Sequence, residues 1–264
     1  MEKTKLVRNA PHQKYHLADG TQVPGGSTIC KIGDDAGALI HWAWNLGREG
    51  KDYRKERDKA ADIGTVAHFL IECFLNNQVA DLSDYGQEDI DKALMCYNKF
   101  VDWWDGQNLE KVATEIQLVN EAHKYGGTID LIARSQKGEH ILIDFKTSKK
   151  ISESYWRQCA GYAQLWNCNQ PRASKIIDGK ECKHIVIGPY QVIPDGVKID
   201  VMELVNQITN HAIVRIGKEE EGDFEVIWRD DLSKEWFVFQ KQVDLYWAMQ
   251  AAKPEPKPRG RKKK

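Results

Sequence analysis

The sequence has no long apolar run, although 41% of its 264 residues are hydrophobic. A membrane-spanning helix needs roughly 18 or more apolar residues without interruption, so none is expected. The first residues, MEKTKLVRNAPHQKYH, hold no apolar segment of the kind found in secretory signals. We therefore expect an intracellular, cytoplasmic protein that is long enough for one large domain or two small ones.

Cysteines are few and scattered, and the eight histidines include no His-Glu-x-x-His motif. No two cysteines lie within four residues of each other, which excludes a zinc knuckle and a Cys-x-x-Cys redox pair. A chain of this size without a secretory signal is not expected to depend on disulfides. We predict reduced thiols at Cys30, Cys73, Cys96, Cys159, Cys168 and Cys182.

Net charge is almost absent, at −1, but the charges are unevenly distributed. The last twelve residues, KPEPKPRGRKKK, carry seven Lys or Arg and one Glu, or +6, which leaves 31 basic and 38 acidic residues, or −7, in the rest. The Pro-rich tail 253–264 is predicted to be disordered. It is expected either to tether a polyanion, with Lys262, Lys263 and Lys264 contacting DNA, or only to keep the protein soluble.

Apolar residues recur at helical spacing in five segments. Ile63, Val66 and Leu70, for example, follow the alternating three- and four-residue steps of a buried helix face. Ser233 is predicted to cap the last helix. The expected helices cover residues 34–46, 53–75, 87–105 and 152–167, with a last one starting at Ser233.

Short runs rich in β-branched residues predict strands elsewhere. The pair Gly126-Gly127 is expected to separate the first two strands, and ILIDF is apolar enough to be central. We predict a single α/β domain with a mixed central β-sheet flanked by helices and an N-terminal helical layer. The expected elements are strands 112–120, 128–134, 139–147 and 184–187, a helix 201–209, a hairpin of 212–218 with 224–229, and either a short hairpin or an ordered arm within 1–30.

Four motifs carry chemically useful side chains in one order along the chain. They are Gly-Thr-Val-Ala-His68 with Glu72, Gly-Gly-Thr-Ile-Asp130, Asp144-Phe-Lys146 and Gln158-x-x-x-Tyr162. Each has a structural interpretation alone, such as a core histidine, a helix salt bridge or a cross-strand ion pair. An apolar strand with an acid and a lysine on one face, however, buries charge. Burying charge costs free energy, and this cost indicates a functional reason for the two residues. One histidine and two carboxylates suit Mg²⁺ or Mn²⁺.

This order resembles the RecB-type branch of the PD-(D/E)XK nucleases. The resemblance covers residues 60–167, and the hairpin and final helix at 212–250 are similar to that family's C-terminal part. It implies a restriction-endonuclease-like core formed by residues 1–252 as a single nuclease domain. The segment 169–208 is longer than the family's usual connection and remains unassigned.

The resemblance also implies roles for individual residues. His68, Asp130 and Asp144 would bind one or two Mg²⁺ or Mn²⁺ ions, with the Phe145 carbonyl as a further ligand. Lys146 would be the catalytic lysine.

The remaining motif residues would support this centre. Gln158 and Tyr162 would position the DNA backbone or water. Glu72, one helical turn beyond His68, would belong to the same catalytic group. Glu115 would either support a metal ligand or be structural.

One feature departs from the family. Several members hold an iron–sulfur cluster with one cysteine before the histidine helix and three near the C-terminus. This chain has Cys30 upstream but no cysteine after Cys182, so we expect no cluster.

The predicted function is metal-dependent hydrolysis of DNA by an exonuclease that acts on ends or single strands. Similar compact chains serve phage DNA replication, recombination and repair, which suggests a recombinase or a single-strand-binding protein as a partner. The lack of a long apolar run argues against a membrane partner. One alternative is a structure-specific or restriction-like endonuclease that uses the same site. The other is a catalytically inactive DNA-binding or scaffold module.

Overall fold

A computed structural model describes residues 5–9, 14–169 and 207–254, together with the backbone of three strands between 172 and 204. No helix of these residues is long and apolar enough to cross a membrane. The predicted disordered tail lies outside the described residues from 255 onward. Among the described side chains, Cys30, Cys73, Cys96, Cys159 and Cys168 form no disulfide.

Six helices are described, and two of them cover the expected residues without change. The second and third expected helices are α3 and α4, whose long apolar faces mark their full extent. The helices are α1 (Gly26–Cys30), α2 (Gly37–Arg48), α3 (Tyr53–Leu75), α4 (Gln87–Asp105), α5 (Glu153–Asn169) and α6 (Ser233–Ala251).

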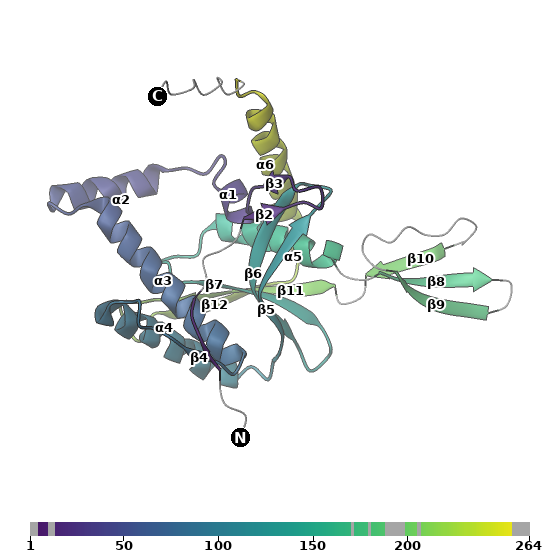
Figure 1. Cartoon of the computed structure of the whole chain (residues 1–264), viewed down its shortest axis with the longest axis horizontal. Helices are drawn as coiled ribbons and strands as arrows, with labels where there is room; N and C mark the ends of the chain where they lie inside the picture. The colour runs from purple at the N-terminus through teal and green to yellow at the C-terminus, as the bar shows by residue number, and fades with distance from the viewer. Residues whose placement is uncertain are drawn as a thin grey trace, which may run out of the picture.

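A five-stranded sheet forms the centre of the molecule, in the order β12-β11-β7-β6-β5 (Figure 1). The strand that contains ILIDF, β7, is central as predicted. It pairs antiparallel with β6 and parallel with β11, so the sheet is mixed and the predicted fold class is confirmed. Its strands are β5 (Glu110–Asn120), β6 (Tyr125–Arg134), β7 (His140–Lys146), β11 (Ile208–Ile216) and β12 (Phe224–Arg229).

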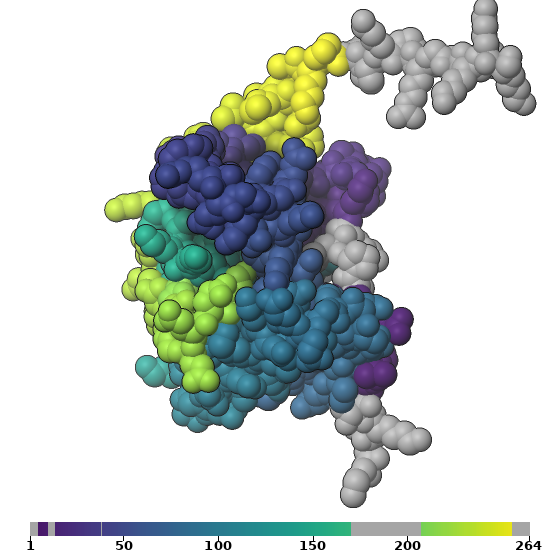
Figure 2. Space-filling view, turned by 90° about the vertical axis from the view of Figure 1, so that its left-hand side faces the viewer, coloured from purple at the N-terminus to yellow at the C-terminus, as the bar shows by residue number. Residues whose placement is uncertain are grey.

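Helices cover both faces of this sheet (Figure 1). On one face, Ile132 and Leu142 pack with α1, α5 and α6 in one core. On the other face, Leu131 and Ile143 pack with α3 and α4 in a second core. This alternation is the two-residue period of a strand that is buried on both sides. Figure 2 shows the outer end of α6 rising from the body in yellow.

Short strands hold the N-terminal segment against the body. Strand β1 (Leu6–Val7) pairs with β4 (Val79–Ala80), and an ion pair joins Arg8 to Asp81 at 2.7 Å. Strands β2 (Tyr15–His16) and β3 (Gln22–Val23) form the expected short hairpin.

Three strands of the segment 169–208 form a separate sheet, in the order β10-β8-β9. The helix predicted at 201–209 is wrong. Residues Ile199–Leu204 form β10, which pairs with β8 (Arg172–Asp178), while β9 (Glu181–Ile187) contains the strand predicted at 184–187. Residues 199–204 form a strand because they pair with β8. A short apolar run in the sequence does not reveal such pairing.

Two local predictions were also wrong. Ser233 is the first residue of α6 rather than its N-cap, which is Leu232, and the Ser233 hydroxyl donates a hydrogen bond to Asp231 instead. Gly126 and Gly127 lie inside β6 rather than between strands.

The two glycines of β6 allow aromatic rings to approach the backbone. A Cβ atom on Gly127 would lie 2.5 Å from Cε1 of Tyr162, and one on Gly126 would lie 2.4 Å from Cγ of Tyr15. Any side chain at either position would therefore displace a tyrosine. The glycine pair fits the strand to its neighbours instead of ending it.

Replacing Gly127 by alanine should destabilise the protein by about 1–3 kcal/mol, because overpacking forces neighbouring side chains to move. Urea unfolding monitored by tryptophan fluorescence measures this loss. Gly222→Ala is the matched control, since nothing lies within 4 Å of its added Cβ, and it should change stability by less than about 0.5 kcal/mol. Equal stability of the two variants would contradict this account of the close packing.

Candidate metal centre

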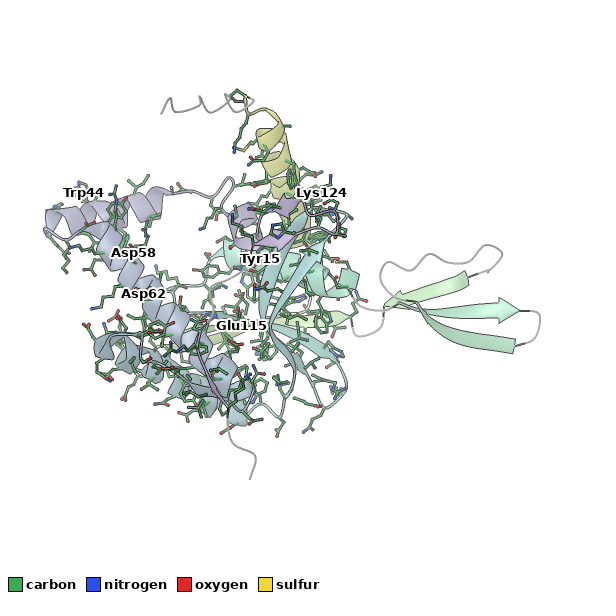
Figure 3. The ribbon with its side chains drawn as sticks, viewed as in Figure 1. Tyr15, Trp44, Asp58, Asp62, Glu115 and Lys124 are labelled. Atoms are coloured by element: carbon green, nitrogen blue, oxygen red, sulfur yellow. The ribbon has the colours of Figure 1, made fainter. Side chains whose placement is uncertain are left out.

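A cleft of about 990 Å³ opens between α3, the sheet and the N-terminal segment. Figure 3 shows Glu115 in the middle of the molecule, where β5 lies beside α3. The cleft brings together side chains from four motifs that are far apart in the sequence. Those singled out by the sequence that line it are His68, Glu72, Glu115, Asp130, Lys146, Gln158 and Tyr162.

The centre lies where the sheet becomes irregular. The regular pairing of β6 with β7 ends at Leu131 and Ile143. Just beyond this pair, Oδ2 of Asp130 accepts a hydrogen bond from the Phe145 backbone N–H at 2.7 Å. This hydrogen bond from β7 fixes the Asp130 carboxylate at the rim of the cleft.

On the other side of β6, the register of β5 leaves Glu115 opposite Asp130. Glu115 has a φ of 48°, in the left-handed region that residues other than glycine seldom adopt. Such a backbone costs about 1 kcal/mol or more and persists only where the surrounding structure enforces it. Here it accompanies a half-buried glutamate side chain that lines the cleft.

Helix α3 brings His68 to the same place. Nδ1 of His68 lies 3.7 Å from Oδ1 of Asp130, and the imidazole ring packs edge-on against Phe145 at 5.8 Å. One turn earlier, a Cβ on Gly64 would lie 2.8 Å from Oγ1 of Thr147. The glycine therefore lets α3 approach the end of β7 closely enough to present the histidine.

Three side chains form a group that could hold a metal ion. One ligand atom each from His68, Glu115 and Asp130 lies within 4.8 Å of the others. Asp144, a predicted ligand, does not belong to this group, and Phe145 contributes an N–H bond to Asp130. Glu115, for which the sequence predicted either a supporting or a structural role, belongs to this group. The only sequence signal was the position of Glu115 in the strand before Asp130, because its unusual φ cannot be read from a pattern.

Asp144 instead pairs with Lys146. The Asp144 side chain is 1% exposed, and burial raises its pKa to about 6, against the opposing effect of the Lys146 charge. Burial disfavours the charged form of Lys146, but the carboxylates of Asp144 and Asp130 outweigh it and raise the lysine pKa. The prediction that Asp144 and Lys146 share one face of their strand is confirmed.

Glu115 lies among three other carboxylates. Burial, followed by the charges of Asp130, Glu72 and Asp144, raises the pKa of Glu115 to about 9. A group of carboxylates arranged in this way favours either protons or a bound cation.

Two residues of α5 complete the wall of the cleft. Nε2 of Gln158 donates a hydrogen bond to the Tyr162 hydroxyl at 2.7 Å. Burial raises the pKa of Tyr162 well above its usual value, so its hydroxyl stays protonated. A second tyrosine, Tyr15 on β2, also lines the cleft and shares a hydrogen bond with Thr128 at 2.9 Å. Sequence reasoning missed Tyr15, which no motif marks.

The residues present fit a hard divalent cation. Histidine nitrogen and carboxylate oxygens are the ligands that Mg²⁺ and Mn²⁺ accept. In addition, Oδ1 of Asp144 is buried without a hydrogen-bond partner among the described residues. Buried carboxylate oxygens are normally satisfied, so this oxygen is suited to a cation or its water.

Comparison with known proteins adds little. No family model and no curated protein matches the chain. Among solved structures, 18 chains match. One is described as the crystal structure of SSO0001. It is 13% identical, with a TM-score of 0.32 over 75% of this chain and 76% of that chain. A likeness this distant carries no argument about the site.

Mn²⁺ should raise the melting temperature of the wild type, because a ligand that binds only the folded state stabilises it by about 2.7 kcal/mol at 100 times its Kd. Asp130→Asn should abolish most of this rise, since it removes a charged ligand. Asp102→Asn, an exposed acid on α4, is the control and should retain the rise. Differential scanning fluorimetry with and without Mn²⁺ measures the effect, and an undiminished shift in Asp130→Asn would exclude this ligand set.

Proposed function

We propose that this protein is a metal-dependent DNA nuclease that hydrolyses phosphodiester bonds. One observation supports it most: the His68–Glu115–Asp130 group and Lys146, which pairs with Asp144, line one cleft. Phosphodiester hydrolysis needs a cation, a positioned water and a positive charge near the phosphoryl oxygens, and it needs no covalent nucleophile. The order of the motifs, similar to RecB-type nucleases, supports the same proposal.

The side chains would divide the chemistry among them. His68, Glu115 and Asp130 would hold Mg²⁺ or Mn²⁺, with Asp144 beside them. The bound ion would supply a Lewis acid for the phosphate and a more acidic water.

The protein itself supplies the other parts. The Lys146 ammonium, kept charged by its carboxylate neighbours, would stabilise negative charge on the phosphoryl oxygens. The hydrogen-bonded pair Gln158 and Tyr162 would orient the DNA backbone or a water at the wall of the cleft.

We propose an exonuclease acting inside the cell on DNA ends or single strands. The experiment compares linear, nicked and closed-circular DNA in Mg²⁺ or Mn²⁺. Degradation of linear DNA with closed circles left intact supports the exonuclease. Cleavage of closed circles would indicate the alternative endonuclease, and DNA binding without cleavage would indicate the inactive binding module.

Lys146→Ala should lower the cleavage rate by about 10²–10³-fold, the usual loss when one electrostatic stabiliser of a transition state is removed. Mn²⁺ binding should persist, because the metal group remains intact. Lys150→Ala, an exposed lysine four residues along, should cleave like the wild type. Single-turnover assays at saturating DNA make the comparison, and an unchanged rate in Lys146→Ala would refute the proposed role.

Deleting residues 253–264 should weaken DNA binding at low salt and flatten its salt dependence, because these residues carry a charge of +6. The slope of log affinity against log salt should fall by about 0.7–0.9 for each phosphate that the tail no longer neutralises. The rate at saturating DNA should hardly change, since no tail residue belongs to the centre. Identical affinity and slope in the truncated protein would leave the tail a solubilising role only.

A further inference from the structure

The ammonium of Lys146 has a second neighbour besides Asp144. Its Nζ atom lies 5.0 Å from the centroid of the Tyr155 ring, within the range of a cation–π interaction. The Lys146 side chain is only 16% exposed. Such an attraction is stronger where water is largely excluded, so the ring is a significant contact for this lysine.

Tyr155 belongs to the same face of α5 as the two residues that line the cleft. The spacing of Tyr155, Gln158 and Tyr162 is three and then four residues, which places them one above another on a helix. Gln158 and Tyr162 line the cleft, whereas the described lining residues do not include Tyr155. The Tyr155 ring is half-buried and packs against the core beneath α5. The Tyr155 ring therefore contacts the lysine from the core side of the cleft wall.

We propose that Tyr155 is a positioning residue that holds the Lys146 ammonium at the cleft. This role rests on the proposed nuclease function of the centre. A lysine side chain is a flexible four-carbon stem with three rotatable donors, and one carboxylate leaves much of that freedom. The ring face adds a second anchor and restricts the ammonium without forming a hydrogen bond. The precise position of a charge matters because electrostatic stabilisation depends on preorganised groups.

The experiment compares two substitutions at this position. Tyr155→Leu removes the ring and should lower the single-turnover cleavage rate by about tenfold, with an unchanged KM for DNA. Tyr155→Phe keeps the ring face and should cleave at nearly the wild-type rate. A Leu variant as fast as wild type, or a Phe variant as slow as the Leu variant, would overturn the proposal. If Tyr155→Leu fails to fold, Tyr155→Met takes its place.

Two further variants separate positioning from general damage. Tyr53→Leu removes a tyrosine that lies 5.7 Å from the Arg54 guanidinium and does not line the cleft among the described residues, so its rate should stay at the wild-type value. In a Lys146→Ala background, Tyr155→Leu should cause no additional loss, because residues that act through one contact are not additive. A full tenfold loss in that background would show that Tyr155 acts independently of the lysine.

A spectroscopic measurement tests the contact without relying on cleavage. The Lys146 ε-methylene protons should show an upfield ring-current shift in NMR spectra of the wild type and of Tyr155→Phe, and should lose it in the Leu or Met variant. Unshifted protons in the wild type would overturn the proposal. If the wild type shows this shift but cleaves no DNA, the nuclease function fails while the positioning of Lys146 by Tyr155 stands.

Discussion

The carboxylate of Asp130 links the central sheet to helix α3, because its two oxygens contact different elements. Oδ2 accepts the Phe145 N–H of the central strand, and Oδ1 faces the imidazole of His68 on α3 at 3.7 Å. The Asp130 backbone carbonyl in turn accepts a hydrogen bond from the Thr114 hydroxyl of β5 at 2.8 Å. Asp130 therefore ties the place where β6 and β7 separate to the position of α3.

Close approach of the surrounding elements depends on small residues at a few points. Gly64 brings α3 to the end of β7, and Gly127 admits the Tyr162 ring over β6. Packing of this density leaves little room for the acids to move apart. The carboxyl groups of Glu115, Asp130 and Asp144 are therefore held together by the fold, and they outnumber the one lysine beside them, so Glu115 keeps a proton at neutral pH.

This imbalance distinguishes the centre from an ordinary buried ion pair. A buried pair with matched charges is satisfied by itself and gives weak evidence of function. Here Asp144 has a partner in Lys146, yet its second oxygen has none among the described residues, and Glu115 acquires a pKa of about 9. Carboxylates kept in such surroundings are a common property of functional sites.

Local sequence patterns were sufficient to predict the long helices, the central strand and seven of the residues that line the cleft. Periodicity over many residues fixed α3 and α4, and the two-residue spacing of Asp144 and Lys146 placed both on one face of β7. Tertiary packing alone established that Glu115 joins His68 and Asp130, because a left-handed φ and a strand register have no signature in a single sequence. Tertiary packing also decided that residues 199–204 form β10. It likewise decided the role of the β6 glycines, whose neighbours Tyr15 and Tyr162 come from distant segments. Contacts between residues far apart in the chain are set by packing, and local patterns cannot encode them.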